Sequence, residues 1–237
     1  MKKIIILLVS IALIVLQQQA VSQVNESGKT ATRVNTDNDT ATGIRKTGDL
    51  FAKLPLNIER LTFFGERADI SPDNKQVAFM SKSFGDAMVI DLKTRCITCL
   101  NCGILAAAFL RVMHLSNGDY ILIGADHFEN IRTSRNRDNE LWYLSKLLSS
   151  KPIKLGQKMS EGATIYKKSM KISFSELHDL VPDVTQGASR IVVADLDLSG
   201  SAPKLMNRQI VFESPDISCT AESGDFYDDG SKLTFTC

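Results

Sequence analysis

The distribution of apolar and polar positions divides the chain into three segments. An apolar run, in which Ser10 is the only polar residue, extends from residue 4 to residue 16. Residues 23–50 show no apolar period and are dominated by Thr, Asn, Asp, Ser and Gly. From Phe51 onward, short apolar stretches alternate with turn residues, and none of them keeps the spacing of an amphipathic helix. Residues 51–237 therefore have the pattern typical of an all-β fold.

The N-terminal run is arranged like a secretory signal peptide. Two lysines precede it, three glutamines follow it, and the small-residue pattern Ala20-Val21-Ser22 comes next. A membrane anchor is the alternative, but thirteen residues fall short of the ~20 that a helix needs to cross a bilayer. The pattern predicts cleavage after Ser22, a secreted or periplasmic mature protein and no membrane span after cleavage. Because no Cys lies at the cleavage point, a lipid anchor is not expected.

The polar segment 23–50 is expected to form a disordered tether. It offers too little apolar surface to offset the entropy lost when a chain is ordered. We therefore expect packed structure to begin near Phe51.

Four stretches of the remaining chain share the order strand, tight polar turn, alternating strand. Turn residues are supplied by Pro72-Asp73, Asn117-Gly118 and Asp229-Gly230. The aligned stretches are residues 68–81, 112–125, 163–176 and 224–237, with Ile70, His114, Ile165 and Phe226 at equivalent positions. These equivalent positions are 44, 51 and 61 residues apart. Repeats of about this length, with four strands each, are the mark of β-propeller blades.

We expect four-stranded antiparallel blades near 65–100, 109–156 and 161–213, and a partial blade at 221–237. In the first blade the strands are predicted near 67–70, 76–81, 87–92 and 97–100. A β-sandwich with hairpins at coincident spacings is the alternative. Because a propeller ring typically has 4–8 blades, three and a half blades predict an incomplete ring and a chain that is truncated at its C-terminus.

The segment Ile70-Ser71-Pro72-Asp73-Asn74-Lys75 through Phe79 resembles the strand–turn–strand signature of TolB-like (WD40-like) propeller repeats. Three longer segments, 61–92, 109–128 and 133–144, are similar to secreted propellers that include saponin hydrolases. The resemblance implies a propeller over roughly 65–237 and the removal of glucuronic acid from triterpenoid saponins. It assigns no catalytic residue in this chain.

Three glutamates at the same aligned position of their blades form a candidate catalytic group. Glu66, Glu161 and Glu222 each lie four residues before the reference position of their blade. The first strand of a propeller blade lines the central channel, so side chains at one register should converge there. Paired carboxyl groups can act as acid and as base or nucleophile in glycoside hydrolysis. The alternative is structural, since such glutamates can pair with an arginine of the neighbouring blade or cap a turn.

Arginines accompany these glutamates. Arg67 and Arg111 share the next register position, and a planar guanidinium suits a uronate carboxylate. The long loops 125–139 and 177–188 should rise at the same end of the channel, where loops often carry function. Polar-ligand contacts are predicted in the first of these loops for Arg132, Arg135, Arg137 and Asp138. A solvated loop of mixed charge is the alternative.

The five cysteines include a C-x-x-C-x-x-C pattern at 96–102. This spacing occurs in metal and iron–sulfur sites, but no fourth ligand is near in the sequence, and export favours disulfides. We therefore expect no metal and no cofactor. Because five is an odd number, one thiol should be free or should lack its partner.

Charge narrows the range of partners. The chain has 28 basic and 27 acidic residues, for a net charge of +1, which argues against nucleic acid and anionic membranes. Two functions remain: a glycoside hydrolase acting on glucuronides, or a non-catalytic module that binds a glycan, another small molecule or a protein partner. The separation of the carboxyl groups, or their engagement in salt bridges between blades, would distinguish the two.

Overall fold

The computed structural model describes residues 51, 54–104, 108–147, 149–214 and 218–237. The chain divides into two compact units, Met1–Phe63 and Phe64–Cys237. In the first unit the guanidinium of Arg60 lies over the rings of Phe51 and Phe63, 4.0 Å and 4.8 Å from their centroids. The predicted signal peptide (1–22) and tether (23–50) lie outside the described residues. Within the described part of the chain, no helix has the length and apolarity required to cross a membrane.

The first sheet is a four-stranded antiparallel meander. Its pairing order is β1 (Glu66–Ile70), β2 (Gln76–Met80), β3 (Ala87–Asp91) and β4 (Ile97–Cys99). The β1–β2 turn is closed by Ser71, whose hydroxyl oxygen accepts hydrogen bonds from the backbone N–H groups of Lys75 and Gln76 at 3.1 Å and 2.9 Å. Side-chain hydrogen bonds of this kind explain why polar residues terminate the apolar stretches.

The second sheet repeats the meander. It contains β5 (Ala108–His114), β6 (Tyr120–Ala125), β7 (Glu140–Leu144) and β8 (Ile153–Lys158). The β6–β7 connection contains two short helical segments, α2 (Ile131–Thr133) and η1 (Ser134–Asp138). Asn130 caps α2, because its side chain accepts a hydrogen bond from the Thr133 N–H at 2.9 Å. The sequence predicted only a loop here, since segments of three and five residues are too short to show a helical period.

The third sheet contains β9 (Ala163–Ile165), β10 (Lys171–Leu177), β11 (Ser189–Asp197) and β12 (Lys204–Ser214), again paired in chain order. A buried ion pair stabilises it: Arg190 Nε donates to Glu176 Oε2 at 2.6 Å, and the two side chains are 4% and 0% exposed. Arg208 Nη2 also lies within 2.8 Å of both Glu176 oxygens. Each buried charge in this sheet is therefore compensated.

A two-stranded hairpin follows, made of β13 (Glu222–Tyr227) and β14 (Lys232–Thr236). Cys219, just before β13, forms a disulfide with Cys237, just after β14. A second disulfide joins Cys99 to Cys102, and Cys96 is a free, exposed thiol. Two disulfides and one free thiol agree with the odd number of cysteines.

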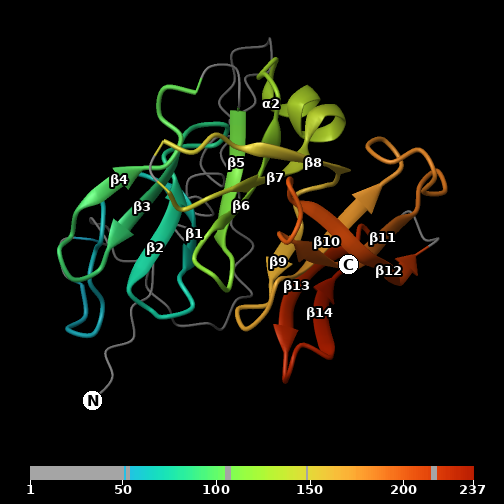
Figure 1. The fold of residues 1–237 in the computed structure, drawn as a ribbon. Helices are drawn as coiled ribbons and strands as arrows, with labels where there is room; N and C mark the ends of the chain where they lie inside the picture. The colour runs from blue at the N-terminus through green and yellow to red at the C-terminus, as the bar shows by residue number, and fades with distance from the viewer. Residues whose placement is uncertain (1–50, 52–53, 105–107, 148, 215–217) are drawn as a thin grey trace, which may run out of the picture. The chain divides into compact units, whose positions relative to one another are not determined.

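Consecutive sheets pack face to face, as β6 shows most clearly. All six β6 residues are buried, and their side chains alternate between two apolar clusters. Tyr120 and Leu122 belong to the cluster shared with the first sheet, whereas Ile121 and Ile123 belong to the cluster shared with the third sheet. The second sheet is thus covered on both faces, which agrees with its place between the other two in Figure 1.

The structure confirms an all-β fold made of four-stranded antiparallel sheets. Each sheet uses strands that are consecutive in sequence, and none of the four described sheets closes on itself. The arrangement is consistent with part of a propeller and not with one continuous sandwich.

Candidate functional site

The first strands of the four sheets line a cavity of about 500 Å³. β1 contributes Arg67 and Asp69, β5 contributes Arg111, Lys167 follows β9, and β13 contributes Asp225. These strands are next to one another in space, since β1 contacts β5, β5 contacts β9, and β9 contacts β13. The inner strands thus bring charged side chains from distant parts of the sequence to one cavity.

Irregularities in two of these strands orient the arginines. The register of β1 with β2 shifts between Glu66 and Asp69, and Arg67 lies in this shift with φ = 55°. The register of β5 with β6 shifts between Phe109 and Arg111. Such shifts turn a side chain away from the regular alternation of a strand, and a non-glycine residue at positive φ is strained. Arg67 therefore departs from the regular alternation of β1.

Glu161 is held by two arginines from other sheets. Arg67 Nη1 lies 3.3 Å from Glu161 Oε2, and Arg135 Nε of η1 forms an ion pair with Glu161 Oε1. Arg67 Nε also lies 3.5 Å from Glu66 Oε1, an oxygen that accepts a hydrogen bond from the Ser83 hydroxyl. Glu66 and Glu161 therefore meet at the same guanidinium, and both are engaged in ion pairs.

Arg111 has a different environment. Its Nη1 donates to the backbone oxygens of Glu161 and Ala163, at 3.3 Å each. Among the described residues, no carboxylate forms an ion pair with it. Burial and the nearby Arg67 lower the pKa of Arg111 below its ordinary value, although the carboxylates of Glu161, Asp69 and Glu222 partly oppose this effect. Arg111 is thus a cavity-lining cation without a contacting counter-charge.

A compact ion network ties three sheets together beside this arginine. Lys167 Nζ lies 2.7 Å from each oxygen of Asp69. Asp69 Oδ2 also accepts the backbone N–H of His114 at 2.7 Å and lies 3.0 Å from its Nδ1. Burial raises the pKa of Asp69, but the bonds from His114 and Lys167 outweigh it, and the net pKa is below the ordinary value of 3.8. The sequence pattern did not single out Asp69 or Lys167, although both lie within two residues of the aligned reference positions.

The other predicted site residues lie elsewhere. Glu222 begins β13 opposite Thr236 and is exposed, and none of the three glutamates is among the residues that line the cavity. Arg137 is exposed and pairs with the half-buried Asp138 at 2.7 Å and with the exposed Glu129 at 2.9 Å. Arg132, in α2, is exposed. Of the four predicted loop residues, the structure brings Arg135 alone to the glutamates.

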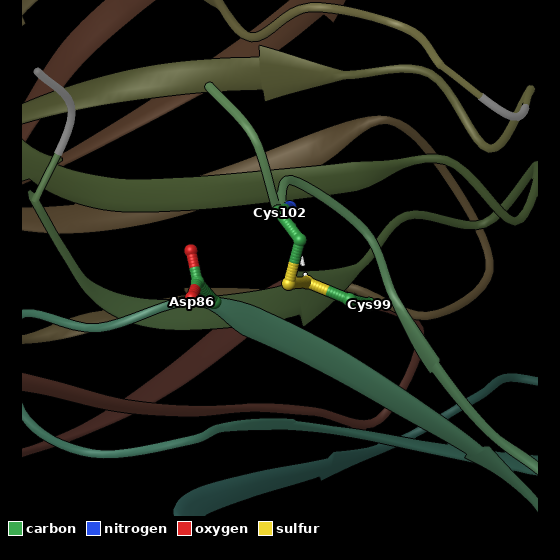
Figure 2. A group of neighbouring side chains, drawn as sticks. All are labelled: Asp86, Cys99 and Cys102. Carbon is green, nitrogen blue, oxygen red and sulfur yellow. Dashed lines mark hydrogen bonds between the residues drawn. A yellow bond between two sulfur atoms is a disulfide. The ribbon is translucent and has the colours of Figure 1, made fainter. Parts of the chain in front are cut away.

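One group among the described side chains has ligand atoms close enough to share a metal ion. It consists of Asp86, Cys99 and Cys102, whose ligand atoms all lie within 4.8 Å of one another (Figure 2). The two sulfurs are bonded to each other, so neither is a thiolate ligand in this state. The cavity itself contains no such group among the described residues.

No protein family model matches this chain, and no curated protein matches it in sequence. Solved structures that resemble this chain include three at 15% identity or less. A putative TolB from Agrobacterium tumefaciens has a TM-score of 0.46 and 15% identity, with 66% of this chain and 53% of that one covered. TolB from Acinetobacter baumannii has a TM-score of 0.40 and 14% identity, with 62% and 34% covered.

The third structure is oligogalacturonate lyase from Vibrio parahaemolyticus, with a TM-score of 0.38, 13% identity, and 69% and 59% of the two chains covered. This chain therefore spans between about one third and three fifths of the length of these proteins. Because all three TM-scores are below 0.5, the fold described above rests on the strands and sheets of this chain alone.

Proposed function

We propose that this chain is the binding part of an exported, TolB-like β-propeller, and that its inner-strand cavity takes a small carboxylate-bearing ligand such as the uronate unit of a glycan. Export is proposed from the N-terminal sequence pattern. The ligand class is proposed from the cavity.

The observation that carries this proposal is the state of Arg111. A half-buried guanidinium without a contacting carboxylate has lost hydration that two carbonyl contacts replace only in part. Its lowered pKa reflects the same unfavourable environment. A bound carboxylate would supply the missing charge, and a guanidinium can hold it through two parallel hydrogen bonds.

The charges of Asp69 and Arg67, which also line the cavity, are consistent with this assignment. Asp69 already accepts bonds from Lys167 and His114, so its charge is satisfied within the protein. Arg67 is engaged with Glu66 and Glu161 but is still 24% exposed. It could therefore support an anion that is held mainly by Arg111.

Glycoside hydrolysis, as in the saponin hydrolases that the sequence resembles, is the second candidate. One observation favours it: Glu66 and Glu161 converge on Arg67. Both roles in hydrolysis need carboxyl groups that are open to substrate. In this structure the two Glu161 oxygens are paired with Arg67 and Arg135. Glu66 Oε1 is paired with Arg67 and accepts a hydrogen bond from the Ser83 hydroxyl. We therefore propose binding as the primary function.

The test is calorimetric titration of the 237-residue chain with methyl glucuronide and with the neutral methyl glucoside. We expect binding of the uronide alone. Arg111→Gln should weaken it by at least about tenfold, because a charge-assisted hydrogen-bonded pair contributes ~1.5–3 kcal/mol. Arg132→Gln is the matched control, since this arginine is exposed and lies outside the cavity, and it should bind as the wild type does.

Equal affinity for both sugars, or wild-type affinity in Arg111→Gln, would overturn the binding assignment. A parallel assay with an aryl glucuronide tests the second candidate. Release of the aryl group by the wild type that Glu161→Gln abolishes would replace binding by hydrolysis as the primary function.

A further inference from the structure

The segment after β4 carries a disulfide that is separate from the cavity and independent of the function proposed above. Cys99 and Cys102 are joined three residues apart. Cys99 is half-buried and Cys102 is exposed, with the carboxylate of Asp86 beside both sulfurs (Figure 2). One sulfur of the bond is therefore open to attack from solvent.

The two residues between the cysteines hold the segment in place without the disulfide. Asn101 is 2% exposed, and its Oδ1 accepts the backbone N–H of Ala87 at 2.7 Å. The Leu100 N–H donates to the Ala87 oxygen at 2.8 Å, and its side chain packs against the cluster between the first and second sheets. Because these contacts do not involve sulfur, both thiols should stay in position after reduction.

The Cys99–Cys102 disulfide closes too short a loop to stabilise the fold substantially. It spans 3 positions, whereas Cys219–Cys237 spans 18. Loop-closure entropy rises with loop length, so the shorter bond restricts the unfolded chain less and stabilises the fold less. The fold gains little from the Cys99–Cys102 bond, which leaves room for a chemical role.

A backbone hydrogen bond makes the two sulfurs unequal. The Cys102 N–H donates to Cys99 Sγ at 3.0 Å (Figure 2). An N–H donor stabilises a thiolate, and the more stabilised thiolate leaves faster in thiol–disulfide exchange. The Asp86 carboxylate disfavours a thiolate on either sulfur, so the asymmetry comes from the hydrogen bond and from exposure. Cys102 is the sulfur to attack, and Cys99 is the leaving group.

We infer that Cys99–Cys102 is a thiol–disulfide exchange site whose substrates are dithiols, which it oxidises. One thiolate of the dithiol attacks Cys102 Sγ, the sulfur–sulfur bond breaks, and Cys99 leaves as a thiolate. The second thiol of the substrate then attacks the sulfur of the substrate in the mixed disulfide and releases Cys102. Two electrons and two protons pass to the protein, and the substrate leaves as a disulfide.

The first test uses dithiothreitol as the dithiol and a Cys96→Ser background, which removes the free thiol. The folded protein is equilibrated with graded ratios of reduced to oxidised dithiothreitol, alkylated with N-ethylmaleimide and analysed by peptide mass spectrometry. Half-reduction of Cys99–Cys102 should need a lower ratio than half-reduction of Cys219–Cys237, the internal control, because the Cys102 N–H stabilises the Cys99 thiolate and so the reduced form. The near-UV circular dichroism should not change.

Reduction of both bonds at the same ratio, or loss of the near-UV signal as Cys99–Cys102 opens, would overturn the inference. So would stoichiometric Zn²⁺ binding by the reduced protein that Asp86→Asn abolishes, because the three side chains would then form a metal site.

The second test addresses the inequality of the sulfurs. In the Cys96→Ser background, Cys102→Ser leaves the Cys99 thiol and keeps the backbone N–H of residue 102, whereas Cys99→Ser leaves the Cys102 thiol. Alkylation by iodoacetamide should reach half its maximal rate at a lower pH for Cys99 than for Cys102. The opposite order would overturn the assignment of the leaving group.

Discussion

The replacement Glu161→Gln distinguishes an ion-pair role of this glutamate from a catalytic one. The carboxylate contacts Arg67 and Arg135, which come from the first and second sheets, and its side chain is 22% exposed. The replacement keeps the shape of the side chain and removes its charge. It leaves Arg135 without a carboxylate partner among the described residues.

The expected decrease in the free energy of unfolding lies between two known limits. Exposed ion pairs contribute about 0–1 kcal/mol, and removing one partner of a fully buried pair costs about 3–5 kcal/mol. The arginine side chains here are 24% and 40% exposed, so both pairs are partly screened by solvent. We expect Glu161→Gln to lower the free energy of unfolding by about 1–2 kcal/mol.

The assay is urea unfolding at pH 7, followed by tryptophan fluorescence and circular dichroism. The midpoint should fall and the slope should stay constant, as for a change in stability alone. Glu222→Gln is the matched control. It has the same register position but is exposed and has no ion pair among the described residues, so it should stay within about 0.5 kcal/mol of the wild type.

A double-mutant cycle with Arg135→Gln should give a coupling energy of at least about 0.5 kcal/mol. The reasoning fails if Glu161→Gln is as stable as the wild type or more stable. Groups retained for chemistry often reduce stability, so that outcome would favour a catalytic role for Glu161.

Two further predictions concern the charges that join the strands. The pKa of Asp69 is lowered in the folded protein, so its contribution to stability is present above the unfolded-state pKa and is lost as the pH falls from about 5 through the folded value. In Asp69→Asn, the unfolding free energy should therefore depend less steeply on pH in this range. An unchanged dependence would contradict the proposed ion pairing of Asp69 with Lys167 and His114. Arg190→Met should lower the unfolding free energy in urea by about 1–3 kcal/mol, because it removes one of the two arginine partners of the buried Glu176 carboxylate while Arg208 remains. Adding Glu176→Gln should restore part of that loss, and a larger loss in the double variant would contradict the assignment.

Strand positions could be predicted because two local signals coincide. Alternating apolar residues mark each strand, and polar turn residues end it, so the strand expected near 76–81 matches β2 (Gln76–Met80) to within one residue. Side chains such as Ser71 then close the turns through their own hydrogen bonds. Both signals act within a few residues of chain, where a single sequence is informative.

Contacts between loops and strands could not be predicted in this way. Arg135 reaches Glu161 from η1, which follows the capped turn α2 in the β6–β7 connection. Helical segments of three and five residues leave no periodic signal. Asp86 lies beside Cys99 and Cys102 for a similar reason. It precedes β3, and the pairing of β3 with β4 brings it to the cysteines. Asp86 is therefore a third ligand-type residue beside these two cysteines, one that the cysteine spacing could not reveal.

Residues at equivalent positions of consecutive blades do not have equivalent contacts. Arg67 and Arg111 occupy the same position of consecutive inner strands, so sequence alone assigns them the same role. Their strands are irregular at different places, and a shift of one residue changes which groups a side chain meets. Arg67 therefore meets the carboxylates of Glu66 and Glu161, whereas Arg111 meets backbone carbonyls. Of two arginines that the sequence treats as alike, Arg111 is the one without a contacting carboxylate among the described residues, and for that reason the proposed binding function depends mainly on it.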